Sequence, residues 1–430
     1  MSYQERLLRV IPGGAHTYSR GFDQYPQNAP QILARGEGAY VYDPDGNEYL
    51  DYGMALRAVN IGYANQEVNQ AALRQMQNGN NLTRASLIEL EAAELLVDLI
   101  PSIDMVKFTK NGSTATTAAI KLSRAFTGRE MVARCRQHPF FSYDDWFIGS
   151  TPVTKGVLKR EVENTRLFDY NDLASLSSLF DQFPNQIACV ILEPAVTEHP
   201  KDNFLHGIKE LCEKNGAVFI LDEMITGFRW HLQGAQTYYN VMPDLCTFGK
   251  AMANGFSVAA VAGKREIMQL GSIEFHGTER VFFLSTTHGA EMCGLGAFVK
   301  TVELLRKHDV VSHIWNFGNR LVAMMNAKAK KLGIEKFFVA GGIDCSPVYF
   351  TYGLDGSISL PLRTLFAQEM LKNRVMIPWI ALSYSHGEKE FSITENAVER
   401  SLEVYKQALE NGVEKYLVGE SVKPVFRKFN

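Results

Sequence analysis

Residues 217–229 read Ala-Val-Phe-Ile-Leu-Asp-Glu-Met-Ile-Thr-Gly-Phe-Arg, and residues 243–250 read Pro-Asp-Leu-Cys-Thr-Phe-Gly-Lys. An uninterrupted apolar run that ends in a charged residue is typical of a strand buried on both faces of a parallel sheet. Asp222 is therefore expected at the carboxyl end of a strand, where open α/β sheets bind their ligands. Lys250 ends a second apolar run and follows Gly249, which leaves room beside the lysine.

Asp222 and Lys250 together suit the chemistry of pyridoxal phosphate. A lysine can form a Schiff base with a carbonyl cofactor. A carboxylate can hold the pyridinium nitrogen of the cofactor in its protonated form, which makes the ring an electron sink. The alternative is a surface salt bridge between two loops. The two residues alone leave both interpretations open.

The two segments resemble the signature of class-III aminotransferases, and within them the branch of glutamate-1-semialdehyde 2,1-aminomutase. The resemblance extends from about residue 8 to the end of the chain, and its further matches occur in the same order as in that branch: Ile11–Gly14, Asp43–Asp51, Pro101–Phe108 and Leu192–Pro194. It implies an α/β protein of PLP-dependent transferase fold type I. Such a protein has a large domain with a mostly parallel, seven-stranded sheet and a small α+β domain.

The chain has 430 residues, 46% of them hydrophobic, which is enough for a large core and more than one domain. We expect residues 1–60 and 309–430 to form the small domain together, and residues 61–308 to form the large, PLP-binding domain. Alternating patterns in this large domain predict strands at 105–109, 131–135, 187–192, 217–222, 245–248 and 258–262, with helices at 65–76, 86–99, 114–126 and 291–307 between or around them. In the small domain they predict a hairpin at 39–52, strands at 336–340 and 346–352, and helices at 309–332, 361–373 and 395–410.

Composition excludes several classes of partner. A net charge of −3 and a pI near 6.4 make nucleic acid an improbable partner. The chain has neither an apolar run long enough to span a bilayer nor the apolar core of a signal peptide at its start. Six cysteines without paired spacing indicate reduced thiols and a cytoplasmic protein. The histidines are scattered, so we predict no metal site.

The segment Asn111–Thr116 reads Asn-Gly-Ser-Thr-Ala-Thr between a predicted strand and a predicted helix. Glycine and hydroxyl residues at a helix N-terminus favour phosphate binding through free backbone N–H groups. The alternative is an ordinary N-cap. The resembled family has Ser-Gly-Thr-Glu here, so Gly112 and Ser113 keep its chemistry, and Thr114 replaces the glutamate. We assign the three residues Gly112 to Thr114 to the cofactor phosphate.

The resemblance also implies the groups that pack on the cofactor ring. Phe140 occupies the place of the aromatic residue that stacks on one face, since stacking needs a ring face and no hydroxyl; its alternative role is that of a core phenylalanine. Met224 should lie on the other face, because it is two residues past Asp222 and points to the same side. Thr286 matches a threonine that reaches the phosphate of the neighbouring subunit, which implies a homodimer with shared active sites.

For the substrate, Arg20 matches the arginine with which the family binds a carboxylate, a contact that suits a guanidinium; the alternative is an arginine that is simply exposed to solvent. Arg57 is a second, weaker candidate. Leu56 stands where the branch has a tryptophan, and the segment 380–386 lacks the glutamate of its catalytic pocket. These departures count against the aminomutase substrate.

We therefore predict an aminotransferase that uses PLP, an amino donor and a carbonyl acceptor, and acts on a small anionic substrate. The alternative within the same branch is glutamate-1-semialdehyde 2,1-aminomutase, which makes 5-aminolevulinate. Two further interpretations remain open: a racemase or decarboxylase that keeps the cofactor, and a binding protein without catalysis on an enzyme scaffold.

Overall fold

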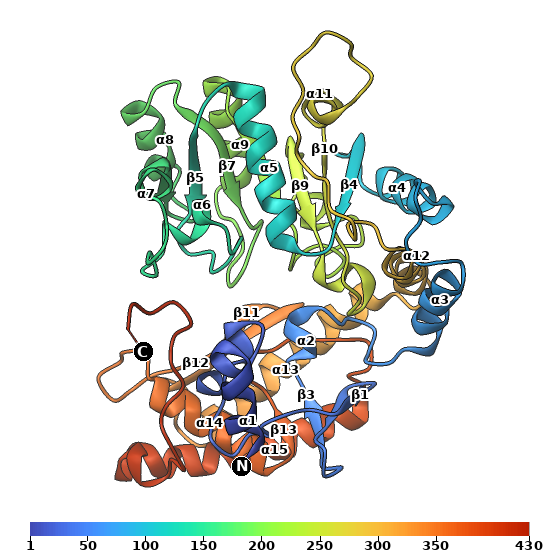
Figure 1. The fold of residues 1–430 in the computed structure, drawn as a ribbon. Coiled ribbons are helices and arrows are strands. Elements are labelled where there is room, and N and C mark those ends of the chain that lie inside the picture. The colour runs from blue at the N-terminus through green and yellow to red at the C-terminus, as the bar shows by residue number, and fades with distance from the viewer. Residues whose placement is uncertain (430) are drawn as a thin grey trace. The chain divides into compact units, whose positions relative to one another are not determined.

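The computed structural model describes residues 1–429 and divides the chain into two compact units. Unit 1 comprises Met1–Asn65 and Ser312–Arg427, and unit 2 comprises Gln66–Val311 together with Lys428 and Phe429. Within residues 1–429, no helix combines the length and the apolar character needed to cross a membrane. Each unit has its own sheet (Figure 1) and its own cluster of buried hydrophobic side chains.

Unit 2 is built on a seven-stranded sheet with the order β4-β10-β9-β8-β7-β5-β6. In that order the strands are Met105–Thr109, Ala259–Gly263, Leu245–Phe248, Val218–Asp222, Ile187–Leu192, Met131–Cys135 and Thr165–Phe168. The predicted, mostly parallel sheet is confirmed, but β10 runs antiparallel to both of its neighbours. Strand β6 was not predicted. Its four residues include a charged arginine and form the edge of the sheet, so they carry no long apolar run.

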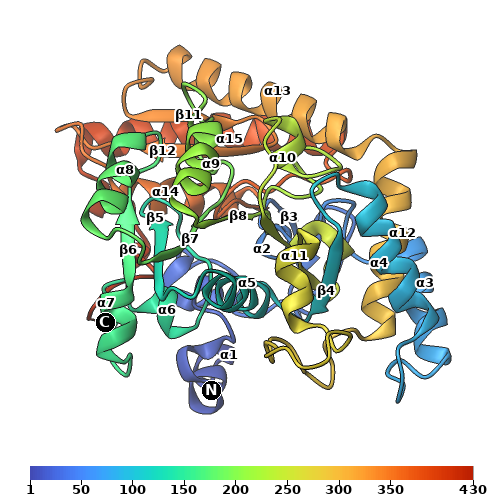
Figure 2. The same cartoon turned by 90° about the horizontal axis from the view of Figure 1, so that it is seen from above.

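Helices cover both faces of this sheet. Figure 2 shows α5 on one face and α8 and α9 on the other. The longer helices of unit 2 are α3 (Gln66–Gln77), α4 (Leu87–Leu99), α5 (Gly112–Thr127), α8 (Leu173–Gln182), α9 (Phe204–Asn215) and α12 (Met292–Lys307). Its short ones are α6 (Asp145–Ile148), α7 (Lys159–Asn164), α10 (Ala235–Tyr238), α11 (Arg265–Met268), and the 3₁₀ turns η4 (Lys250–Ala253) and η5 (Gln269–Gly271). Every residue of β7 and β8 is buried, as the continuous apolar runs predicted.

Unit 1 combines a mixed four-stranded sheet, order β1-β2-β3-β13, with a β-hairpin and helices. The strands are β1 (Arg35–Glu37), β2 (Tyr40–Tyr42), β3 (Glu48–Asp51), β11 (Phe338–Ile343), β12 (Ser346–Thr351) and β13 (Val375–Met376). The helices are α1 (Tyr3–Val10), α2 (Met54–Arg57), α13 (Val310–Lys331), α14 (Leu360–Lys372) and α15 (Glu388–Asn411), with 3₁₀ turns η1 (Pro12–Gly14), η2 (Tyr18–Arg20), η3 (Phe22–Gln24) and η6 (Val413–Lys415). Parallel pairing of β3 with β13 joins the N-terminal and C-terminal parts of the chain in one sheet.

Two differences from the sequence prediction concern unit 1. Helix α15 begins at Glu388, seven residues before the predicted start, because the Glu390 side chain accepts a hydrogen bond from the backbone N–H of Gly387 and caps the helix. The segment α2 was not predicted at all. Its residues have positive φ angles, from 40° at Met54 to 67° at Arg57. The segment is therefore a left-handed turn of four residues, none of which is glycine.

Candidate active site

Asp222 lies at the carboxyl end of β8, where only 1% of its surface is exposed. One carboxylate oxygen accepts hydrogen bonds from the Thr247 hydroxyl (2.9 Å) and from the backbone N–H of Met224 (3.0 Å). Burial raises the pKa of Asp222 to about 6, and these two hydrogen bonds and the charge of Lys250 act against that rise. The Asp222 carboxyl therefore holds its proton more tightly than a solvent-exposed aspartate does, and a positive partner would stabilise its ionised form.

Lys250 follows β9, the strand beside β8, and begins the 3₁₀ turn η4. Its φ of 46° is unusual for a residue with a side chain and is typical of a backbone that the surrounding structure holds in a functional site. Asp222 pairs with Thr247 in the parallel register of β8 and β9, and Lys250 follows Thr247 by three residues, so both groups lie at the carboxyl ends of adjacent strands. The structure thus brings together the acid and the lysine that the sequence singled out.

The Met224 side chain links three segments of the site. A Cβ atom built on Gly249 would lie 2.6 Å from the Met224 sulfur, and one built on Gly112 would lie 2.9 Å from the same atom. Both distances are shorter than van der Waals contact, so a side chain at either position would force the Met224 side chain to shift. The start of α5, the residue before Lys250 and the residue two past Asp222 therefore meet at one point.

This close approach predicts an interaction between two substitutions. We expect Gly249→Ala to lower the free energy of unfolding by about 1–3 kcal/mol, because the added methyl group overlaps the Met224 sulfur. In a Met224→Ala background the same change should cost less than about half as much, since the sulfur is gone. Urea unfolding of both single variants and the double variant measures the difference. Gly341→Ala is the control, because a Cβ at Gly341 meets nothing within 4 Å. Equal costs in both backgrounds would contradict the contact.

The N-terminus of α5 has the geometry of an anion site. The Asn111 side chain caps the helix by accepting the backbone N–H of Thr114 at 2.9 Å. The N–H groups of Gly112 and Ser113 precede the first intrahelical hydrogen bond, so they lack an acceptor within the helix. The positive end of the helix dipole adds to the attraction for an anion there. Asn111 therefore caps the helix, and its neighbours present the N–H groups.

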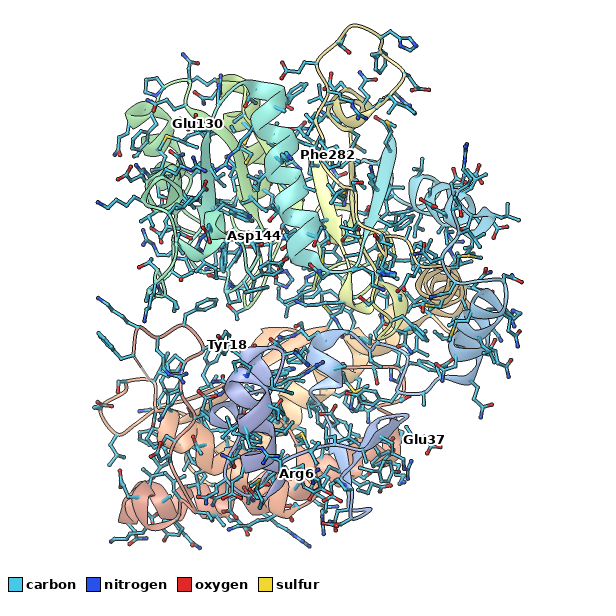
Figure 3. All side chains as sticks on the ribbon, viewed as in Figure 1. Arg6, Tyr18, Glu37, Glu130, Asp144 and Phe282 are labelled. Carbon is cyan, nitrogen blue, oxygen red and sulfur yellow. The ribbon has the colours of Figure 1, made fainter. Side chains whose placement is uncertain are left out.

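A loop after β5 is fastened to this helix end. The Ser113 hydroxyl accepts the backbone N–H of Tyr143 at 3.2 Å, and the Thr116 hydroxyl donates to the Phe141 carbonyl at 2.9 Å. The Thr117 hydroxyl also donates to the carboxylate of Asp144, which lies beside this end of α5 (Figure 3). Phe140 directly precedes Phe141, whose carbonyl is bonded to Thr116, so the backbone of Phe140 is held close to α5.

The two adjacent phenylalanines of this loop have different surroundings. Phe141 is buried and packs edge-on against Phe147, with ring centroids 5.8 Å apart. Phe140 is 49% exposed and contacts Phe147 by its edge at 5.6 Å. Phe141 is thus the core residue of the pair, whereas about half of the Phe140 surface is exposed.

Thr286 lies in an exposed turn between η5 and α12. The backbone N–H of Gly289 donates to its carbonyl at 3.2 Å, and the Asn81 side chain donates to the carbonyl of Thr287 at 2.9 Å. The assignment of Thr286 to the phosphate of a neighbouring subunit remains a prediction.

The two predicted substrate arginines belong to unit 1. Arg20 ends the turn η2, is exposed, and lines a cavity of about 970 Å³ within that unit. Arg57 ends the left-handed turn α2, is half-buried, and is not among the residues that line the cavity. Arg20 is therefore the better placed of the two for a ligand in unit 1.

Three residues that matter to this geometry were missed in the sequence. Thr247 pairs with Asp222 in the register of β8 and β9, and a lone hydroxyl in the apolar run 245–248 was the available signal. Asn111 was quoted within its motif without its role as the cap. Asp51, whose carboxylate accepts the backbone N–H groups of Gly53 and Met54 at the start of α2, had no signal, because this role depends on contacts made by the folded chain.

Comparison with known proteins agrees with this arrangement. The model of the family described as aminotransferase class-III matches residues 23–342. Glutamate-1-semialdehyde 2,1-aminomutase 1 of Lachnoclostridium phytofermentans is 30% identical over 93% of this chain and 97% of that protein. The 3-aminobutyryl-CoA aminotransferase of Cloacimonas acidaminovorans is 31% identical over 95% of this chain and 98% of that protein.

Solved structures resemble the fold over nearly the whole chain. The FumI protein of Sphingopyxis sp. MTA144, solved in a PLP internal aldimine form, has a TM-score of 0.86 and 26% identity, covering 95% of this chain and 97% of that one. An omega-transaminase from Sphaerobacter thermophilus has a TM-score of 0.82 and 25% identity, covering 94% and 97%. The chain therefore belongs to the class-III aminotransferase family.

Proposed function

We propose that this chain is an aminotransferase that moves an amino group between a small anionic amine and a carbonyl compound. Its cofactor is pyridoxal phosphate, which supplies an aldehyde that takes up the amino group and a ring that delocalises an electron pair. The observation that carries the proposal is the meeting of three features around Met224: the buried carboxylate of Asp222, the lysine at Lys250, and the N-terminus of α5 at Gly112.

Each feature has a distinct task in this proposal. Lys250 holds the cofactor covalently between turnovers and, once released, moves a proton from the substrate carbon. Asp222 would hold a proton at the ring nitrogen, and that positive charge would counteract the burial that raises the pKa of the Asp222 carboxyl. The N–H groups of Gly112 and Ser113, with the Thr114 hydroxyl, bind the phosphate.

The other predicted residues contact the cofactor ring, the substrate or a second subunit. The exposed face of Phe140 packs against one side of the ring, and Met224 packs against the other. Arg20 binds the carboxylate of the substrate, with Arg57 as a second candidate. Thr286 contacts the cofactor phosphate of a second subunit, so we propose a homodimer with shared active sites. We also propose a cytoplasmic location, which fits six free cysteines.

The second candidate is glutamate-1-semialdehyde 2,1-aminomutase, favoured by the relative of that name at 30% identity. Both reactions use the same proton transfer. They differ in whether a separate carbonyl compound accepts the nitrogen or the same molecule receives it back at a neighbouring carbon. The 3-aminobutyryl-CoA aminotransferase at 31% identity favours the first of these reactions.

The visible absorbance of the PLP-loaded protein separates the two candidates. We expect the cofactor band to bleach when an amino donor is added and to return only when a separate keto acid or aldehyde follows. Stopped-flow absorbance with a panel of donors and acceptors measures both halves. Conversion of glutamate-1-semialdehyde to 5-aminolevulinate without any donor would make the protein an aminomutase. A protein that binds no cofactor even with excess PLP would contradict both.

A further inference from the structure

Phe147 lies at the centre of an aromatic cluster in unit 2. It belongs to the short helix α6, and only 1% of its surface is exposed. The rings of Phe140, Phe141 and Trp146 contact it edge to face, with ring centroids 5.6–6.0 Å apart and ring planes at 70–79°. Phe141 and Trp146 are buried, so Phe140 is the member of the cluster that reaches solvent. Phe140 makes no other ring contact with any of residues 1–429, so Phe147 is the ring that holds it against the core.

Arg134 of β5 contacts Phe147 both directly and through Ser150. The guanidinium carbon lies over the Phe147 ring, 4.9 Å from its centroid, where a cation is attracted by the π-electrons. The Arg134 Nε–H donates to the Ser150 hydroxyl at 2.6 Å, and that hydroxyl donates to the Phe147 carbonyl at 2.6 Å. The ring and the backbone of Phe147 are therefore both held by the same arginine.

The same guanidinium closes the segment that carries Phe140. Arg134 donates to the carbonyl of Cys135 at 2.9 Å and to the carbonyl of Ser150 at 3.0 Å, and these two residues are the ends of the segment 135–150. A planar guanidinium makes both contacts at once, because its N–H groups project in fixed directions. Phe140 and Phe147 both lie within this closed segment.

The burial of Arg134 is unfavourable in itself. The residue is 4% exposed and forms no ion pair with a carboxylate of residues 1–429. Burial lowers the pKa of its guanidinium to about 10, which leaves it charged at neutral pH. A buried cation without an anionic partner lowers stability unless hydrogen bonds compensate for the lost water. The other residues of β5 are Met, Val, Ala and Cys, so an apolar residue would suit this strand better, and the arginine indicates a task beyond filling the core.

We propose that Phe147 and Arg134 are positioning residues for the ring of Phe140. The proposal rests on the proposed function, in which Phe140 packs on the ring of the cofactor. Phe147 fixes the Phe140 ring by its edge contact, and Arg134 fixes Phe147 and closes the segment 135–150. About half of the Phe140 surface is exposed, so without these contacts its side chain would be free to take several orientations. Ordering that side chain on binding would then weaken the affinity for the cofactor.

Binding of pyridoxamine phosphate, the amine form of the cofactor, to the cofactor-free protein tests this proposal without turnover. The probe has no aldehyde and cannot bond covalently to Lys250, so its affinity reports on noncovalent contacts. Inorganic phosphate is the second probe, because it reports on the N-terminus of α5 alone. In Phe147→Leu we expect the ratio of the phosphate Kd to the pyridoxamine phosphate Kd to fall about threefold to tenfold, since one aromatic contact is lost. Isothermal titration measures the Kd of pyridoxamine phosphate, and competition against it measures that of phosphate, which should stay the same.

Phe180→Leu is the matched control for this variant. Phe180 is also a buried phenylalanine of unit 2, but it packs in the hydrophobic cluster between the sheet and α8 and α9. Each substitution removes a ring from a core, so both should lower the melting temperature. Only Phe147→Leu should change the ratio of the two Kd values.

A double variant shows whether Phe147 acts through Phe140. Phe140→Leu alone should lower the ratio at least as much as Phe147→Leu does. In the Phe140→Leu background, Phe147→Leu should cause no further change, because the ring that it positions is gone. Effects that multiply independently in the double variant would overturn the positioning role.

A second pair of variants tests Arg134. Arg134→Lys keeps the charge but lacks the planar fork that reaches both ends of the segment, so we expect the ratio to fall about twofold to tenfold, comparable to one lost hydrogen bond. Arg129→Lys is the control, because Arg129 also donates to two backbone carbonyls, those of Ile187 at 3.1 Å and Asn215 at 2.7 Å, outside the segment 135–150. A lower melting temperature of Arg134→Lys with an unchanged ratio would reduce Arg134 to a stabilising residue.

The outcomes separate this proposal from the proposed function. A ratio near one in the unmodified protein would mean that the cofactor ring is not bound, and it would overturn both. A high ratio that Phe140→Leu lowers and Phe147→Leu leaves unchanged would overturn the positioning role alone. A high ratio that neither variant changes would remove Phe140 from the cofactor ring, and this proposal with it, while Lys250 and Asp222 would keep their assignments.

Discussion

Replacing Lys250 by alanine should abolish the visible absorbance band of the PLP-loaded protein and lower amino transfer by at least about a thousandfold. The expected loss is large because one side chain has two tasks in the proposed function: it is the covalent attachment point, and it is the group that moves the proton. Absorbance after reconstitution and a coupled transfer assay measure both effects. The amine form of the cofactor should still bind, because the phosphate site at α5 and the carboxylate of Asp222 do not depend on the lysine.

Lys264→Ala provides the comparison for this experiment. Lys264 also lies in unit 2 and is held by an ion pair with Asp244 at 2.6 Å, but it has no place in the proposed mechanism. We expect this variant to keep both the band and the activity. If Lys250→Ala keeps a visible band and turns over at the rate of the control, the covalent attachment point is another residue, and the assignment of Lys250 is wrong.

The sequence predicted the parts of the site that depend on long, regular patterns. Strands β7 and β8 are fully buried and read as apolar runs, so the place of Asp222 at a strand end followed from the sequence. The antiparallel direction of β10 could not be predicted, because a buried strand has the same apolar run whether it is parallel or antiparallel to its neighbours. The edge strand β6, only four residues long, had too little pattern to be recognised.

The left-handed turn α2 illustrates the limit of such prediction. Its residues Met54, Ala55, Leu56 and Arg57 are good formers of right-handed helix, and nothing in their order signals positive φ angles. The conformation arises from hydrogen bonds to Asp51 and Tyr63 that exist only once the chain has folded. Pattern analysis misses such a feature, because tertiary contacts impose a conformation that the residues themselves do not favour.

We expect Asp222→Asn to lower amino transfer by roughly two to four powers of ten, because a neutral amide cannot hold a proton at the ring nitrogen of the cofactor. The variant should nevertheless fold and bind the cofactor. The amide oxygen can still accept the Thr247 hydroxyl and the Met224 N–H, which now bond to one carboxylate oxygen. Steady-state kinetics with saturating cofactor measure the loss. Asp98→Asn, a change on the exposed side of α4, is the control and should leave the rate unchanged.

Asp222→Asn lowers activity, but it should stabilise the cofactor-free protein at neutral pH. Burial raises the pKa of Asp222 from 3.8 to about 6, so the folded state binds this proton more tightly than the unfolded state. That contribution to stability is fully present below about pH 3.8 and is lost as the pH rises to about 6. A difference of about 2 pH units, at 1.36 kcal/mol each, corresponds to a loss of about 3 kcal/mol. An asparagine releases no proton and escapes this loss.

Urea unfolding of the cofactor-free proteins between pH 4 and pH 7.5 tests the expectation. The free energy of unfolding should fall across this range in the unmodified protein relative to Asp222→Asn, until the variant is the more stable by up to about 3 kcal/mol at pH 7.5. Bound PLP should reduce the difference, because a cationic ring nitrogen beside Asp222 lowers its pKa. Parallel curves for the two cofactor-free proteins would mean that Asp222 ionises normally in the folded state. A residue selected for catalysis is expected to lower the stability of the free protein in this way until the cofactor binds.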